Sequence, residues 1–305
     1  MPHDHRRHDE GHAHAPRGYD FAFALGVALN LALVLAELAF GFLSNSLALI
    51  SDGVHNLSDV LGLLLAWGGS WLATRQPSAS RTYGYRRASI LAALGNASLL
   101  LVATGGLLAE AAQRLADPPP VASSTVLWVA SIAIAINTAT ALMFMRGREK
   151  DLNIKGAFLH MAADAAVSLG VVIAALLIGQ TGWLWLDPVT SVAVAVVLLW
   201  SGWGVMRDAL NLALDAVPAG IDRPAVEAYL AGLPGVIEVH DLHIWGMSTT
   251  ETALTAHLVR PHAGLDDPLL ADVARELDRR FCIHHATIQI ESGATECRLA
   301  PSHVV

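Results

Sequence analysis

Six long apolar segments fill most of the first two thirds of the chain, and they limit what it can fold into. They cover residues 19–43, 47–73, 88–111, 124–145, 155–179 and 183–205. Each is near or above the roughly 20 residues that a helix needs to cross a bilayer. Because lipid offers no partners to backbone polar groups, such segments cross membranes as helices. The sequence therefore predicts an all-α membrane domain of six transmembrane helices.

The composition agrees with a membrane protein. Of the 305 residues, 54% are hydrophobic and only 15% are charged, whereas soluble proteins carry about 25% charged residues. Two cysteines are too few for a disulfide framework. The net charge of −8 lies mostly after Arg207 and argues against nucleic acid as a partner. No short apolar core with a cleavage site begins the chain, so the first segment is predicted as a helix and not a signal peptide.

The charges between the segments predict the orientation. Basic residues gather between the second and third segments and between the fourth and fifth, namely Arg75, Arg81, Arg86, Arg87, Arg146, Arg148, Lys150 and Lys155. The opposite side has Arg114 alone. The positive-inside rule places the basic loops, and with them both termini, in the cytoplasm. We expect a multi-pass protein of the bacterial inner (plasma) membrane, with Trp183 and Trp185 as an interfacial anchor.

After Arg207 the pattern changes to that of a small globular domain. Residues 221–233 and 266–281 have helical patterns, and residues 237–247, 252–259 and 286–291 read as strands. The order α-β-β-α-β predicts a two-layer α+β domain of ferredoxin- or metallochaperone-like type, with helices on one face of an antiparallel sheet. The predicted organisation is a histidine-rich tail (1–18), a six-helix transmembrane domain (19–206) and a cytoplasmic domain (207–305).

The same short pattern occurs in the second and fifth segments. His55 and Asp59 form one H-x-x-x-D pair, and His160 and Asp164 form another. Residues four apart share a helix face, so each segment presents an imidazole beside a carboxylate. Ionisable groups at membrane depth are costly and mark functional sites. Two nitrogen and two oxygen ligands suit tetrahedral Zn²⁺, although two hydrogen-bonded polar pairs joining helices would give the same pattern.

The residues around the first pair resemble a family signature. Residues 46–59, SLALISDGVHNLSD, are similar to the second helix of cation diffusion facilitators, the ZnT-type zinc transporters. The His160 and Asp164 pair resembles that family's fifth helix, and Gly62 stands where the signature usually has Ala or Ser. The resemblance implies a homodimer in the lipid bilayer that exports Zn²⁺ in exchange for H⁺ by alternating access. It implies Zn²⁺ as the transported substrate and no cofactor.

The donor types independently favour this chemistry. Zn²⁺ needs deprotonated ligands, so its binding releases protons and its unloading lets them return. Two nitrogens favour Zn²⁺ over Mg²⁺, Ca²⁺ or Mn²⁺, which prefer oxygen shells. A broader exporter of Cd²⁺, Co²⁺ or Fe²⁺ is the alternative within the family. A membrane zinc hydrolase would need an open metal position, and no H-E-x-x-H motif occurs. A passive channel or sensor is a third class.

A second metal constellation is predicted in the C-terminal domain. His240, His257 and Glu291 each fall on a predicted strand, and a turn near Ser248 would make the two histidines cross-strand neighbours. Their spacings resemble the cytosolic zinc site of ZnT-type domains, and Cys297 or a partner chain's tail could complete it. Strand parity predicts that His240 and His243 point to opposite sheet faces. Ordinary surface histidines are the competing interpretation.

Three further groups of residues bear on metal binding or on the membrane domain. The tail histidines His3, His5, His8, His12 and His14 suggest weak metal capture by a disordered segment. The loop 74–89 has no His, Cys, Asp or Glu, so the additional metal site that the family sometimes has there is predicted to be absent. Polar residues within the apolar segments could line an aqueous cavity or bond between helices: Asn30, Glu37, Asn45, Asp52, Asn96, Asn137 and Asp187. Asp52, three residues before His55, is expected beside the metal ligands and not among them.

Overall fold

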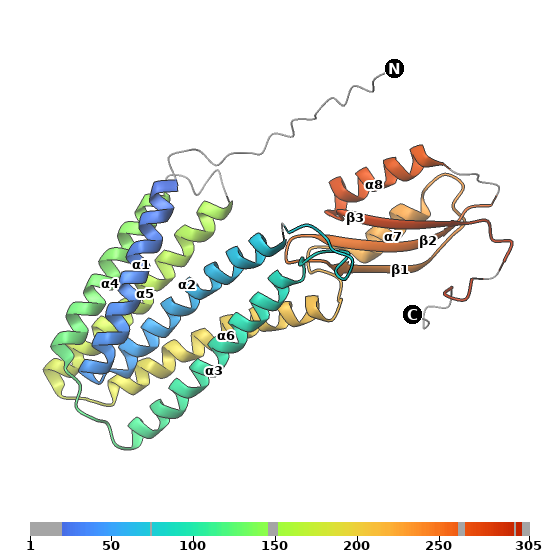
Figure 1. Cartoon of the computed structure of the whole chain (residues 1–305). Coiled ribbons are helices and arrows are strands. Elements are labelled where there is room, and N and C mark those ends of the chain that lie inside the picture. Colours follow the sequence, from blue (N-terminus) through green and yellow to red (C-terminus); the bar gives the residue numbers. More distant parts are fainter. Residues whose placement is uncertain (1–19, 74, 146–151, 262–265, 296, 301–305) are drawn as a thin grey trace. The chain divides into compact units, whose positions relative to one another are not determined.

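The computed structural model describes residues 20–73, 75–145, 152–261, 266–295 and 297–300. The histidine-rich tail, the basic residues Arg146, Arg148 and Lys150, and His262 and His303 lie outside them. The first 213 residues contain six long helices (Figure 1), which are α1 Asp20–Ser44, α2 Leu47–Ala73, α3 Ala88–Ala116, α4 Ser123–Met145, α5 Leu152–Thr181 and α6 Leu186–Ala213. The six predicted helices are therefore confirmed, although α6 continues past the predicted end at residue 205.

Four of these helices are long and apolar enough to cross a membrane by length and composition. They are α3, α4, α5 and α6, and the described part of α1 adds the shorter apolar stretch Ala28–Ser44. In α2 the apolar pattern is interrupted by polar residues such as Asp52, His55 and Asp59. Because isolated polar groups are costly in lipid, this helix must place them against protein or water.

The chain divides into two compact units. One comprises Met1–Val60 with Gly105–Ala195, and the other comprises Leu61–Thr104 with Val196–Val305. In the first unit α4 packs along α5 and also contacts α1. Its buried apolar side chains include Leu49 of α2, Ala130 of α4 and Val171 of α5, which belong to one cluster. The segment of α2 that carries the first H-x-x-x-D pair is thereby packed against the helix that carries the second.

Small residues let α1 and α2 approach each other closely. A Cβ added to Gly53 would lie 2.9 Å from Leu38 Cδ2 and 3.1 Å from Glu37 Cβ. One added to Gly41 would lie 2.8 Å from Ile50 Cγ1. The two glycines therefore allow α1 and α2 to lie close together, and this packing brings Glu37 against the polar face of α2.

The C-terminal domain is an α+β fold, as predicted. It consists of α7 Arg223–Ala231, β1 Glu238–Gly246, β2 Thr252–Val259, α8 Asp267–Phe281 and β3 His285–Glu291 (Figure 1). The strand order is β1-β2-β3, with β1 antiparallel and β3 parallel to β2. The prediction of an antiparallel sheet was wrong for β3. The crossover helix α8 returns the chain to the starting end of β2, and such a connection makes neighbouring strands parallel.

One face of this sheet carries the core of the domain. Val226 and Leu230 of α7 and Val273 and Leu277 of α8 pack against buried strand residues, including Leu254. Each helix begins at an aspartate that caps it, as Asp222 accepts from Ala225 N and Asp266 accepts from Leu269 N. The Arg260 guanidinium beside Asp266 also holds the pKa of that carboxyl below its usual range. Because α7 and α8 pack against the same core residues of the strands, both helices cover the same face of the sheet, and the other face is left for polar residues.

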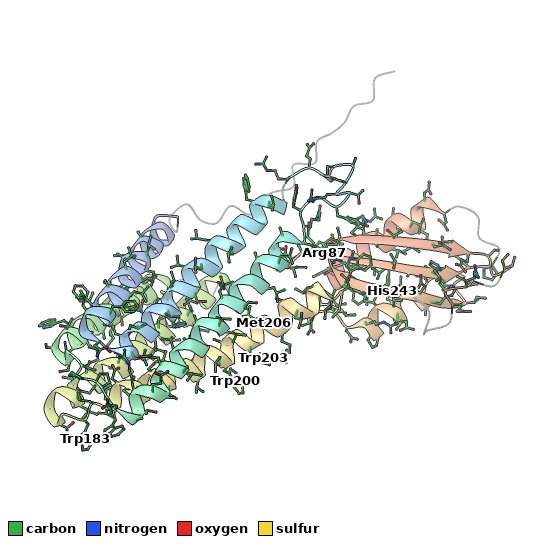
Figure 2. The ribbon with its side chains drawn as sticks, turned by 60° about the horizontal axis from the view of Figure 1, so that its bottom comes forward. Arg87, Trp183, Trp200, Trp203, Met206 and His243 are labelled. Carbon is green, nitrogen blue, oxygen red and sulfur yellow. The ribbon has the colours of Figure 1, made fainter. Side chains whose placement is uncertain are left out.

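Large aromatic side chains are exposed on several helices. Trp200 and Trp203 project from α6, and Trp183 lies in the turn that precedes it (Figure 2). Trp183 and Trp185 stack with ring centroids 5.9 Å apart. Exposed apolar surface of this size is unusual on a soluble protein, and it is the surface that a bilayer covers.

Candidate metal centres

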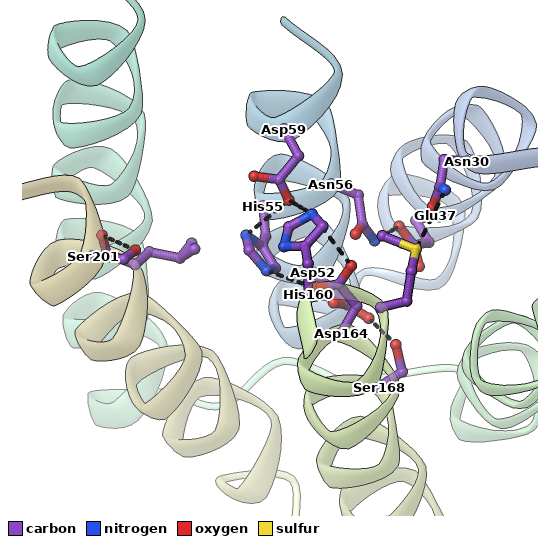
Figure 3. Close-up of polar contacts among 12 residues, drawn as sticks. Asn30, Glu37, Asp52, His55, Asn56, Asp59, His160, Asp164, Ser168 and Ser201 are labelled. Carbon is purple, nitrogen blue, oxygen red and sulfur yellow. Dashed lines mark hydrogen bonds and ion pairs between the residues drawn. The ribbon is translucent and has the colours of Figure 1, made fainter. Parts of the chain in front are cut away.

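The two H-x-x-x-D pairs meet in the first unit, where one turn of α2 faces one turn of α5 (Figure 3). His55 Nε2 lies 3.2 Å from Asp164 Oδ1, and His160 Nε2 lies 3.4 Å from Asp59 Oδ2. Within each helix, His55 Nδ1 is 3.5 Å from Asp59 Oδ2, and His160 Nε2 is 3.7 Å from Asp164 Oδ2. Each imidazole therefore contacts both carboxylates. We call these four residues the membrane tetrad.

The spacing of the tetrad suits a tetrahedral ion. Zinc–nitrogen and zinc–oxygen bonds of about 2.1 Å place two tetrahedral ligands about 3.4 Å apart. The three separations from Nε2 atoms span 3.2 to 3.7 Å, whereas His55 contacts Asp59 through Nδ1, which cannot bind the same ion as its Nε2. Donor atoms of His55, Asp59 and Asp164 all lie within 4.8 Å of one another. His160 is outside that tightest group, although its Nε2 reaches both carboxylates.

Exposure is uneven across the tetrad. The exposed side-chain fractions are 17% for His55, 31% for Asp59, 42% for His160 and 1% for Asp164. Asp59 Oδ2 itself is buried and has no hydrogen-bond partner in the described part of the chain. A buried oxygen between two imidazoles, without a bond to satisfy it, is a position that a cation would satisfy. The site is closed at Asp164 and open at His160.

Further polar residues surround the tetrad. Ser168 Oγ donates to Asp52 Oδ2 at 2.9 Å, and Asn56 Nδ2 donates to Glu37 Oε2 at 2.7 Å (Figure 3). Asp52 and Glu37 are fully buried. Asp52 thus lies beside the tetrad, as expected. Ser168 was not predicted, although it follows Asp164 by four residues and so shares its helix face.

Asp187 fixes the start of the helix that carries His55 and Asp59. Its carboxylate accepts hydrogen bonds from Ser46 Oγ and from the backbone of Leu47 and Ala48, the first residues of α2. An anion at this position satisfies free N–H groups and opposes the helix dipole. Asp187 therefore acts as a cap. Asn45, which precedes α2 at a φ of 55°, donates to Pro120 O, so both residues have structural partners.

The residues of the second predicted metal site also lie close together, on the face of the C-terminal sheet that α7 and α8 leave uncovered. His240 and His257 are direct cross-strand partners. His240 Nε2 lies 3.4 Å from Glu291 Oε2, and His257 Nδ1 lies 3.0 Å from Glu291 Oε1. Cys297 Sγ lies 3.6 Å from His257 Nδ1. Donor atoms of all four residues lie within 4.8 Å of one another. We call these residues the sheet cluster.

The sheet cluster fits a metal with a thiolate ligand. A zinc–sulfur bond of about 2.3 Å places sulfur about 3.6 Å from a nitrogen ligand, which is the separation between Cys297 and His257. His240 Nε2 is buried and has no hydrogen-bond partner among the described residues. Two nitrogens, one sulfur and one carboxylate oxygen would complete four-coordination, and these are ligands that zinc accepts.

A β-bulge corrects the predicted direction of His243. The register pairs His240 with His257 and His243 with Thr255, and the shift between them falls at Asp241, whose φ is 49°. Because Thr255 and His257 are two apart on β2, their partners share one face. His240 and His243 therefore lie on the same face, and the prediction of opposite faces was wrong. Parity fails where one strand holds an extra residue.

The bulge adds a residue that the sequence did not indicate. Asp241 Oδ2 lies 3.4 Å from His257 Nε2, and Asp241 Oδ1 lies 2.8 Å from His243 Nε2. His257 thus has Asp241 on one ring nitrogen and Glu291 with Cys297 on the other. A carboxylate behind a histidine fixes the nitrogen that faces a metal. His284 and His285 are not part of the sheet cluster.

Comparisons with known proteins give the family. The chain matches the cation efflux transmembrane domain over residues 23–212 and the cytoplasmic domain of cation efflux proteins over residues 218–293. The metal cation efflux system protein CzcD of Cupriavidus metallidurans is 36% identical over 295 residues, which are 96% of this chain and 93% of the relative. The zinc transporter ZitB of Escherichia coli is 35% identical over 88% of this chain and 86% of the relative.

A third relative, from Bacillus subtilis, is named a cadmium, cobalt and zinc/H(+)-K(+) antiporter. It is 34% identical over 93% of each chain. The protein described here therefore belongs to the cation efflux family, and the resemblance to cation diffusion facilitators is confirmed. It is a metal-cation transporter and not an enzyme, with its metal as cargo and not as a cofactor.

Proposed function

We propose that this protein exports Zn²⁺ from the cytoplasm by alternating access, through the membrane tetrad between α2 and α5. The observation that carries the proposal is the meeting of both H-x-x-x-D pairs, with separations from the Nε2 atoms to carboxylate oxygens close to those of a tetrahedral zinc shell. Four protein ligands leave no open position for catalysis, and a closed shell of this kind suits cargo that must be held and released.

We propose proton exchange as the driving reaction. Zinc binds deprotonated imidazole and carboxylate groups, so loading releases protons and unloading allows them to return. Imidazole exchanges its proton near neutral pH, and both imidazoles contact both carboxylates in the tetrad. Without the metal, protons on these groups would offset the charge of two carboxylates. The name of the Bacillus relative, which includes H⁺ and K⁺ antiport, supports the same coupling.

A broader metal range is the second candidate. The Bacillus relative is named for cadmium and cobalt as well as zinc. The tetrad is also open at His160, where a half-exposed ligand tolerates altered geometry. Nitrogen and carboxylate donors accept several first-row divalent ions, so selectivity depends on geometry. Zinc remains the proposed main cargo because the described donors make a compact shell of two nitrogens and two oxygens.

The C-terminal domain supplies a proposed second zinc site and the surface of a homodimer. The sheet cluster has a thiol and is more enclosed than the tetrad, since the side chains of His240, His257 and Glu291 are each less than 15% exposed. It lies on the sheet face that the helices leave uncovered. We propose that zinc bound there stabilises the domain and its pairing, and that both termini lie in the cytoplasm of a bacterial cell, as the basic loops indicate.

Transport in proteoliposomes tests the proposal. The full-length protein should move zinc against its gradient when a pH gradient is imposed, and the proton flux should run in the opposite direction. The double variant Asp59→Ala with Asp164→Ala should do neither. A panel of Zn²⁺, Cd²⁺, Co²⁺, Fe²⁺ and Mn²⁺ separates the two candidates. Zinc flux that ignores the pH gradient, or that never exceeds equilibration, would instead indicate a channel.

A further inference from the structure

Two buried carboxyl groups lie next to the membrane tetrad and are not among its ligands. They are Glu37 of α1 and Asp52 of α2, and both are fully buried. Each accepts one hydrogen bond from a neutral donor, Asn56 for Glu37 and Ser168 for Asp52 (Figure 3). The other oxygen of each group, Glu37 Oε1 and Asp52 Oδ1, is buried without a hydrogen-bond partner among the described residues.

Close helix packing forces Glu37 into this position. Gly53 allows α1 to approach α2 so closely that a Cβ would lie 3.1 Å from Glu37 Cβ. Asn56, one turn further along α2, then holds Glu37 Oε2 at 2.7 Å. The carboxyl is thus fixed against the helix that carries His55 and Asp59, yet its hydrogen-bond partner is Asn56 and not either of those residues. Its place follows from backbone packing and from an amide that is not a metal ligand.

No basic side chain of the described part of the chain forms an ion pair with either carboxyl. The charged or titratable groups that act on Glu37 are Asp52 of α2 and Asp164 of α5. Those that act on Asp52 are His55, Asp164 and Glu37. Apart from His55, every one of these neighbours is acidic. A carboxylate that is removed from water and surrounded by other acids is very costly, and it takes up a proton instead.

We propose that Glu37 carries one of the counter-transported protons, at a position separate from the metal ligands. The inference rests on the proposed zinc–proton exchange. With the tetrad empty of metal, Glu37 is a neutral carboxylic acid, which removes one negative charge from this buried group of acids. When Zn²⁺ enters the tetrad, its charge stabilises nearby anions. The O–H bond of Glu37 then breaks heterolytically, the electron pair stays on the carboxylate oxygen and the proton passes to water.

The reverse step completes the exchange. When zinc leaves on the other side of the membrane, Glu37 lies again among other acids without the charge of the metal, and it takes a proton from that side. The proton on Glu37 therefore moves against the metal without occupying a ligand of the tetrad. No oxidant or further reactant is needed, since only a proton changes place. The ratio of protons to zinc would exceed what the four ligands alone supply.

The number of protons released on zinc binding tests this inference. Zinc would be added to the detergent-solubilised full-length protein at several pH values, with a pH-indicator dye recording the protons released. Glu37→Gln keeps the size of the side chain and an oxygen for Asn56 but cannot ionise. It should release about one proton fewer per zinc, and its zinc affinity should depend less steeply on pH, by about one proton. Glu37→Asp should restore most of the release.

A matched variant controls for loss of a glutamate from a membrane helix. Glu110→Gln makes the same change in α3, where Glu110 is half-exposed and pairs with Arg114, and it should release the wild-type number of protons. Transport in proteoliposomes gives a second readout, since Glu37→Gln should lower the proton-to-zinc ratio and not only the rate. An infrared band of a protonated carboxyl that disappears on zinc addition should be weakened in Glu37→Gln.

Several outcomes would overturn the inference. Equal proton release by the wild type and Glu37→Gln would show that Glu37 holds no exchangeable proton. If zinc transport by the wild type depends on potassium, and Glu37→Gln loses that dependence but keeps the proton-to-zinc ratio, the Glu37 carboxylate binds a monovalent cation and not a proton. These results differ from failure of the proposed function. If Asp59→Ala with Asp164→Ala still transports zinc, the tetrad proposal fails. If that double variant is inactive but Glu37→Gln releases the wild-type number of protons per zinc, only the inference about Glu37 is contradicted.

Discussion

The membrane tetrad and the sheet cluster use similar ligands but are built in different ways. The tetrad takes two residues from one turn of each of two helices, and its exposure rises from Asp164 to His160. The sheet cluster takes one residue from each of three strands and adds Cys297 after them. It includes a thiol, and the three strand residues are all largely enclosed. A site for cargo must release its ion, whereas a structural site gains from keeping it.

This difference predicts where zinc is held and where it passes. The tetrad lies between helices, so a small shift of α2 against α5 would change both contacts that join them, His55 to Asp164 and His160 to Asp59. The sheet cluster is fixed by backbone hydrogen bonds within one sheet, which leave its two histidines as direct partners. The helix pair can therefore change ligand geometry at little cost, and the sheet cannot. Four experiments test this comparison, and they follow in order of decreasing expected effect.

The largest effect is expected from removing the most buried ligand of the tetrad. Asp164→Ala takes away one of four donors and leaves His55 without its 3.2 Å partner. We expect zinc flux into everted vesicles to fall at least about 100-fold, since losing a ligand removes a bond and the closed shell. Expression and dimerisation should persist. Near-normal flux in this variant would mean that the tetrad is not the transport site.

A change of donor type should alter selectivity more than rate. His55→Asp leaves one nitrogen and three carboxylate ligands, a harder site that favours Mn²⁺ relative to Zn²⁺. We expect the zinc-to-manganese flux ratio to fall about tenfold. His160→Asp makes the same change at the more exposed ligand and should shift the ratio less. If an active His55→Asp variant keeps the wild-type metal ranking, selectivity is determined elsewhere in the chain.

Loss of the sheet cluster should remove stabilisation by zinc and only slow transport. A ligand at 100 times its dissociation constant stabilises a folded protein by about 2.7 kcal/mol. In the full-length protein, His240→Ala with His257→Ala should abolish the zinc-dependent rise in melting temperature of the C-terminal domain. The pair His284→Ala with His285→Ala changes two histidines outside the sheet cluster and serves as the control. A double variant as inactive as Asp164→Ala would contradict the division between the two sites.

The smallest effect is expected at the bulge. Asp241→Asn keeps a residue that tolerates the φ of 49° but removes the charge behind His257. Loss of such a partner typically weakens metal binding 10- to 100-fold, and we expect about tenfold at the sheet cluster. Asp241→Gly preserves the backbone and removes the carboxylate, so it should behave alike. Titration with a competing zinc indicator measures both variants, and wild-type affinity in both would show that Asp241 only shapes the strand.

The helical part of the protein could be predicted closely because its signals are local. The H-x-x-x-D spacing places His55 beside Asp59 through helix geometry alone, and the apolar segments give the helices their lengths. The strand residues were harder to place. His240 and His257 could be paired from the turn between their strands, but the direction of His243 could not, because the bulge at Asp241 leaves no sign in the alternation of residues.

By itself the sequence determined six membrane helices, an α+β domain and two sets of candidate ligands, because periodicity, length and donor chemistry are local properties. The tertiary structure decided which of these residues meet. It brought α2 against α5, made β3 parallel through the α8 crossover, and placed Asp241 behind His257. It also enclosed Glu37, since the close approach at Gly53 depends on two helices at once. The burial of the Glu37 carboxyl depends on how two helices pack, so it cannot be predicted from the sequence of either helix alone.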